Sequence, residues 1–65
     1  MAGTLEYRKA RKLSQKAVDV AETLQGGHRS DVLECKRQVY SLLKGERTEN
    51  AKMYRKNVTW AAEQM

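Results

Sequence analysis

The sequence predicts an all-α domain, a small bundle of three helices that run up, down and up. Three segments carry apolar residues at steps of three and four, which is the spacing of one helix face. Proline is absent, and good helix formers such as Ala, Leu, Lys, Glu and Gln are frequent. The 65 residues make one domain, residues 1–65, and short connections make neighbouring helices antiparallel. The alternative is a helical hairpin that completes its core by dimerising.

The first helix is expected at about residues 5–25. Thr4 is a suitable N-cap, and Gly26-Gly27 is a strong stop signal. The apolar stripe of this helix consists of Ala10, Leu13, Ala17, Val20 and Leu24, with Ala21 beside them.

The second helix is expected at about residues 31–44, between the N-cap Ser30 and the C-cap Gly45. Its apolar arc is broader than that of the first helix, which is typical of an element contacted from both sides. The stripe is Val32, Cys35, Val39 and Leu42, widened by Leu33, Tyr40 and Leu43.

The third helix is expected at about residues 48–64, with Thr48 as the best cap. Its core stripe is Ala51, Tyr54, Val58, Ala61 and Met65. Across the three helices, the core is expected to depend on Leu13, Val39, Leu42 and Val58.

The residues that usually carry catalysis or bind metals are few and scattered. Cys35 lies on the apolar stripe of the second helix, and His28, the only histidine, follows the two glycines. Gly26-Gly27 lacks the lysine and the spacing of a phosphate-binding loop. We therefore expect no enzyme activity, no cofactor and no metal site.

Thirteen basic and eight acidic residues give a net charge of +5, which favours an acidic partner. No apolar run approaches the roughly 18 residues of a membrane span, and a single cysteine suits a reducing compartment. An intracellular location is expected, in the cytoplasm or the nucleus.

The third helix carries a candidate partner-binding surface. At 100° per residue, Met53 and Trp60 lie opposite the core stripe, one heptad apart. Both residue types are enriched at protein interfaces, and Lys52 and Lys56 would flank the patch. The alternative is a rotated helix in which Trp60 fills the core.

The first helix carries a basic ridge. Lys9, Lys12 and Lys16 share one face, and Arg8 and Arg11 stand nearby, without an acidic residue between positions 8 and 16. Such a ridge suits an acidic protein or nucleic acid, although most charged helix faces are merely solvated.

Nucleic-acid binding is the alternative function. A helix-turn-helix would use the third helix as reader. The candidate contacts are Arg47, Asn50, Lys52, Arg55, Lys56 and Asn57. Against this motif, Lys44 and Glu46 occupy positions of the turn that are normally apolar.

Two segments resemble the MIT (microtubule-interacting and trafficking) family, namely Asp-Val-Leu-Glu-Cys at 31–35 and Lys-Asn-Val-Thr-Trp-Ala at 56–61. The resemblance covers residues 8–65 loosely. Lys36 replaces a tyrosine that is common in the family, and its acidic residue near the end of the first helix is matched only by Asp19 or Glu22. The resemblance implies a three-helix domain that receives short helical motifs, often between its first and third helices.

The sequence thus predicts a non-enzymatic protein-interaction module that binds an amphipathic, acidic helix or a second copy of itself.

Overall fold

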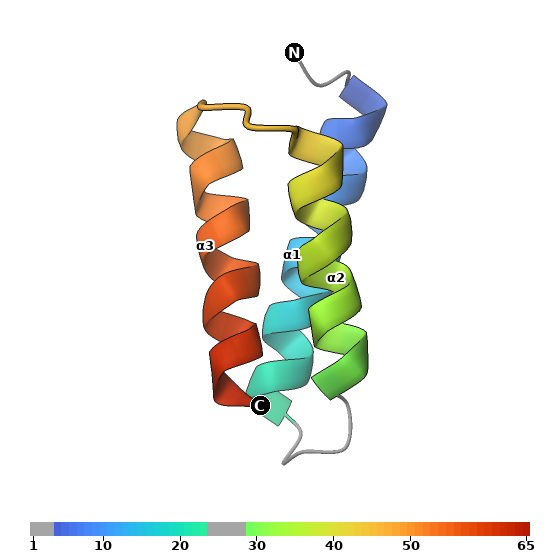
Figure 1. Ribbon diagram of the computed structural model, residues 1–65, viewed down its shortest axis with the longest axis vertical. Helices are drawn as coiled ribbons and strands as arrows, with labels where there is room; N and C mark the ends of the chain where they lie inside the picture. Colours follow the sequence, from blue (N-terminus) through green and yellow to red (C-terminus); the bar gives the residue numbers. More distant parts are fainter. Residues whose placement is uncertain (1–3, 24–28) are drawn as a thin grey trace.

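The computed structural model describes residues 4–23 and 29–65, which form the three helices α1 (Thr4–Thr23), α2 (Arg29–Leu43) and α3 (Glu49–Gln64). The helices lie side by side, with α2 antiparallel to both α1 and α3 (Figure 1). Every pair of helices is in contact, and the molecule measures 35 × 17 × 14 Å. The predicted all-α three-helix bundle is confirmed.

The core lies along the axis between the three helices. The α2 helix contributes the larger side chains, whereas α1 and α3 contribute mostly alanines, which allow these two helices to approach closely. The buried apolar residues are Ala10 and Ala17 of α1, Val32, Cys35, Val39 and Leu43 of α2, and Ala51, Val58 and Ala61 of α3. Ser14 is also buried, which the apolar pattern of the sequence did not indicate.

The observed core differs from the expected one at several positions. Leu43 is only 1% exposed and is the largest fully buried side chain, whereas Leu42 and Leu13 are half-buried and pack on the edge of the core. Leu33 and Tyr40, expected to widen the α2 stripe, are exposed. Residues three and four positions after Val39 both lie near its face of the helix. The sequence pattern alone therefore allows either Leu42 or Leu43 to be buried in the core.

The helix ends agree with the sequence in part. Thr48 is the N-cap of α3, and its Oγ1 accepts a hydrogen bond of 3.2 Å from the backbone N–H of Ala51. In contrast, Thr4 and Ser30 lie inside α1 and α2 rather than before them, a difference within the usual uncertainty of helix ends. The predicted turn Gly26-Gly27, with Leu24 and His28, lies outside the described residues.

Gly45 has the role at the end of α2 that its sequence position predicted. Its φ of +81° is left-handed, a conformation that costs a residue with a Cβ about 1 kcal/mol. The N–H of Lys44 donates to the carbonyl of Tyr40 at 2.9 Å, and that of Glu46 donates to the carbonyl of Leu43 at 2.8 Å. This tight turn brings α3 back along α2 (Figure 1).

Candidate interaction surfaces

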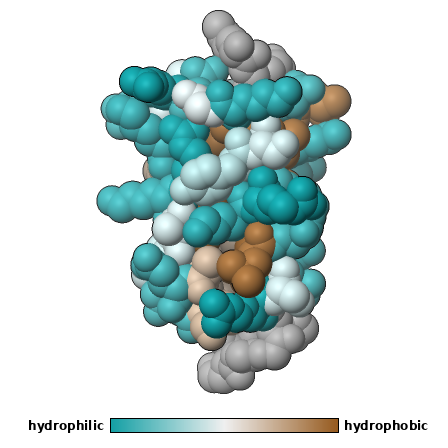
Figure 2. Space-filling model, viewed as in Figure 1, coloured by the Kyte–Doolittle hydropathy of each residue, from teal (hydrophilic) through white to brown (hydrophobic). Residues whose placement is uncertain are grey.

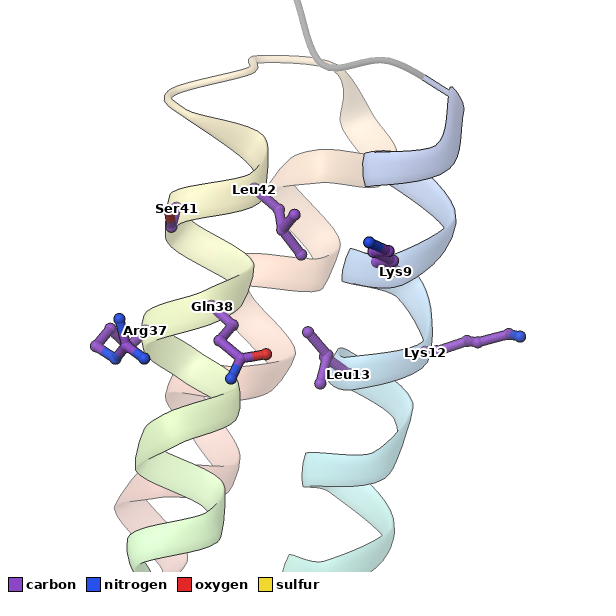
Figure 3. A pocket seen from close by; sticks show the side chains of 7 residues that line it. All are labelled: Lys9, Lys12, Leu13, Arg37, Gln38, Ser41 and Leu42. Atoms are coloured by element: carbon purple, nitrogen blue, oxygen red, sulfur yellow. The ribbon is translucent and has the colours of Figure 1, made fainter.

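A groove of about 560 Å³ runs between α1 and α2. We call it the α1–α2 groove. Leu13 and Leu42 point into the gap between the two helices, and the side chain of Gln38 extends over the same gap (Figure 3). The lining residues are Lys9, Lys12 and Leu13 of α1 with Arg37, Gln38, Ser41 and Leu42 of α2.

The groove has an apolar floor and a basic rim. Its floor is formed by the half-buried Leu13 and Leu42, which rest on the core. Its rim carries Lys9, Lys12 and Arg37, and none of the lining residues is acidic. The arrangement can hold an apolar side chain on the floor and a carboxylate at the edge.

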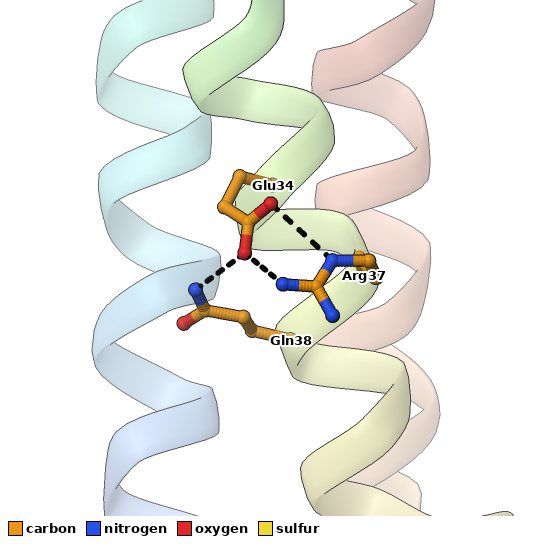
Figure 4. Close-up of polar contacts among 3 residues, drawn as sticks. All are labelled: Glu34, Arg37 and Gln38. Carbon is orange, nitrogen blue, oxygen red and sulfur yellow. Dashed lines mark hydrogen bonds and ion pairs between the residues drawn. The ribbon is translucent and has the colours of Figure 1, made fainter.

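Glu34 organises the α2 side of this rim (Figure 4). Its carboxylate accepts hydrogen bonds from Arg37, one of them from Nε at 3.3 Å, and from Nε2 of Gln38 at 2.8 Å. The bonds from Arg37 and then from Gln38 lower the pKa of Glu34, and the same contact raises the pKa of Arg37. Glu34 partly neutralises Arg37, whereas Lys9 and Lys12 form no ion pair with any residue in 4–23 and 29–65.

The basic ridge of α1 is divided between two sides of the bundle. All five of its bases, Arg8, Lys9, Arg11, Lys12 and Lys16, are exposed. Within residues 4–23 and 29–65, none of the five forms an ion pair. Lys9 and Lys12 border the α1–α2 groove, whereas Arg8 and Arg11 border a smaller pocket between α1 and α3.

Met53 and Trp60 are on the surface, as the helical angles predicted. They are 49% and 41% exposed, so the alternative that Trp60 fills the core is wrong. Lys52 and Lys56 are also exposed. Met53 and Trp60 lie seven positions apart on α3 and therefore project from the same side of this helix. We call them the Met53–Trp60 ridge.

Replacing Trp60 with alanine is therefore expected to lower the free energy of unfolding by about 1 kcal/mol or less. Urea denaturation followed by circular dichroism measures the change, with Val58→Ala on the buried face of the same helix as the control. Iodide should quench the tryptophan fluorescence of the dilute protein efficiently. A shielded indole, or a loss as large as that of Val58→Ala, would contradict the surface position.

Two further apolar side chains are exposed on α2. Leu33 and Tyr40 are exposed on this helix, and the hydroxyl groups of Tyr40 and Thr59 of α3 share a hydrogen bond of 2.9 Å. On the face shown in Figure 2, one small hydrophobic patch lies in the lower part of the bundle where α2 borders α3, and most of the surrounding surface is hydrophilic. The hydrogen bond gives Tyr40 a role in holding α2 and α3 together.

The predicted nucleic-acid contacts do not share one face. Arg55 and Asn57 are both half-buried, and they lie about 200° apart around α3. In addition, α2 and α3 run antiparallel along the bundle (Figure 1), whereas the helices of a helix-turn-helix cross at about 90–120°. The geometry of that motif is therefore absent from α2 and α3.

The burial of Cys35 and the positions of the potential metal ligands bear on reactive groups in the described part of the chain. Cys35 is 4% exposed, and its burial raises the pKa of its thiol, which disfavours the reactive thiolate. Among the described residues, no three His, Cys, Asp or Glu side chains meet as metal ligands would. None of the helices in residues 4–23 and 29–65 has the length and apolar character to cross a membrane.

The sequence pattern does not indicate the α1–α2 groove. It places Leu13 and Leu42 in the core, and it gives Arg37, Gln38 and Ser41 no role. One signal was available, because adjacent residues such as Leu42 and Leu43 point about 100° apart and only one can face the core directly.

Comparison of the chain with protein-family models, with curated proteins and with solved structures gives no match. The resemblance to the MIT family therefore stays a prediction from the sequence.

Proposed function

We propose that this protein is a non-enzymatic docking module whose α1–α2 groove binds an acidic amphipathic helix. The observation that supports this most is the apolar floor of Leu13 and Leu42 between the bases Lys9, Lys12 and Arg37. Such a helix would place its apolar stripe on the leucines and its carboxylates beside the rim.

The shape of the groove favours a helix as the occupant. Two antiparallel helices form its walls, and a third helix laid along them packs in the way of a four-helix bundle. Apolar residues of the partner at steps of three and four would reach Leu13 and Leu42 from one face. Leu13 and Leu42 stay half-buried because α3 does not cover the α1–α2 groove. A bound helix would bury them fully.

The charge of the groove favours an acidic partner. With +5 on the whole chain and two lysines at the rim, the approach of a negatively charged helix is accelerated and that of a basic helix is slowed. The chemistry of the exposed rim thus selects the partner, whereas the apolar floor supplies most of the affinity.

Two further surfaces remain candidates. The ridge of Met53 and Trp60, flanked by Lys52 and Lys56, suits a second protein contact or self-association, because large apolar side chains are exposed there. Nucleic-acid binding would use the exposed basic residues of α1, and it would weaken steeply with salt. All three hypotheses suit a location in the cytoplasm or the nucleus.

A synthetic helix tests the proposal. The probe carries leucines at steps of three and four with glutamates on both flanks, and its matched control has glutamine in place of each glutamate. We expect saturable binding of the acidic probe in a fluorescence anisotropy titration, and affinity for the control lower by about tenfold or more. Equal affinity for both helices, or none for either, would contradict the proposed function.

A further inference from the structure

A small pocket lies between α1 and α3, on the opposite flank of α1 from the α1–α2 groove. Its volume is about 220 Å³. The lining residues are Tyr7, Arg8 and Arg11 of α1 with Asn50 and Tyr54 of α3. We call it the arginine–tyrosine pocket. None of its lining residues belongs to the α1–α2 groove, so a proposal for this pocket does not depend on the proposed function.

One wall of the pocket is aromatic and fixed in place. The rings of Tyr7 and Tyr54 meet edge to face, with centroids 5.6 Å apart and an interplanar angle of 76°. The hydroxyl of Tyr7 shares a hydrogen bond of 3.0 Å with Oγ1 of Thr48, which also caps α3. The wall is therefore held from both helices before any ligand arrives, which reduces the entropy lost on binding.

The other wall is cationic and unpaired. Arg8 and Arg11 lie one helical turn apart, and both are exposed. Within the described part of the chain, neither makes an ion pair, and no acidic side chain lines the pocket. The same two arginines border an adjoining hollow with Lys12 and Gln15, so positive charge continues beyond the pocket.

We propose that the arginine–tyrosine pocket binds an aryl phosphate, the group that a phosphotyrosine side chain presents. Two guanidinium groups match the charge of a phosphate dianion and can each donate two hydrogen bonds to it. The amide of Asn50 is a further donor, and the tyrosine wall offers an apolar surface for the ring of the ligand.

The size of the pocket limits the ligand. A volume of about 220 Å³ is below the roughly 300–1,000 Å³ of sites for drug-sized molecules. The pocket itself accommodates one ring with one phosphate, and the adjoining hollow of about 590 Å³, bordered by the same two arginines, leaves room for the residues that flank a phosphotyrosine in a peptide. Aspartate and glutamate side chains bring a single charge and no ring, so they match only part of the site.

The experiment uses the full chain and phenyl phosphate, followed by two-dimensional ¹H–¹⁵N NMR. We expect saturable shifts at Arg8, Arg11, Asn50 and Tyr54, and weaker binding of inorganic phosphate by about fivefold or more, because it lacks the ring. A short peptide with phosphotyrosine should bind at the same residues, whereas the unphosphorylated peptide should not.

Substitutions locate the site. The double change Arg8→Gln and Arg11→Gln should weaken phenyl phosphate binding by about tenfold or more, since both charged donors are removed. Arg29→Gln removes one positive charge from an exposed residue at the other end of the bundle, so it is the matched control for each of the single changes Arg8→Gln and Arg11→Gln. Circular dichroism verifies that each variant is folded.

Several results would overturn the assignment. They are the absence of saturable binding, equal binding of inorganic phosphate, and equal effects of the two sets of substitutions. Preferential binding of a single-stranded oligonucleotide at the same residues would replace the aryl phosphate with nucleic acid as the ligand.

Discussion

Replacing Leu43 with alanine is expected to destabilise the bundle by about 2–5 kcal/mol. Leu43 is the largest fully buried side chain, and it lies on the helix that supplies most of the core volume. A domain of this length has only about 3–5 kcal/mol available from its core, so the variant should be largely unfolded. Urea denaturation followed by circular dichroism measures the loss.

Leu42→Ala is the matched control, with the same chemical change one residue earlier. Because Leu42 is half-buried on the floor of the α1–α2 groove, its truncation should cost less than about 2 kcal/mol and leave a folded protein. A larger loss for Leu42→Ala than for Leu43→Ala would mean that α2 is rotated relative to the structure described above.

Reversing the charge of the groove rim is expected to have the largest effect on binding. The double change Lys9→Glu and Lys12→Glu replaces two attractions with two repulsions toward an acidic helix. At about 0.5 kcal/mol for each, affinity should fall by about 2 kcal/mol, or roughly 30-fold. Anisotropy titrations at low and high salt measure the loss, and salt should reduce the difference.

Lys52→Glu with Lys56→Glu provides the control for net charge. It changes the charge of the protein by the same amount, on the α3 face that carries Met53 and Trp60. We expect a much smaller effect than that of the groove variant. If the α3 variant loses more affinity, the acidic helix binds the Met53–Trp60 ridge instead.

Much of the fold could be predicted because it depends on local periodicity. The three apolar stripes located the helices to within a few residues, and the caps Thr48 and Gly45 occupy their expected positions. The choice between Leu42 and Leu43 could not be predicted, since it depends on how α2 is rotated against both neighbours. That rotation is a tertiary property, and steps of three and four are equally helical.

The candidate sites could be predicted from the sequence where they lie on one helix, but not where they combine two helices. Helical angles along α3 were enough to place Met53 and Trp60 opposite the core, because both belong to one element. The α1–α2 groove and the arginine–tyrosine pocket each combine side chains from two helices. Their positions depend on how far apart those helices lie and how they are aligned. The spacing of residues within one segment does not specify either.

The central claim is that the α1–α2 groove receives an acidic amphipathic helix. An NMR titration of the ¹⁵N-labelled protein with the acidic probe helix tests it most directly. We expect the largest shift changes at Leu13, Gln38 and Leu42, with small changes at Met53 and Trp60. Changes confined to Met53 and Trp60, or spread evenly along the charged residues, would contradict the claim.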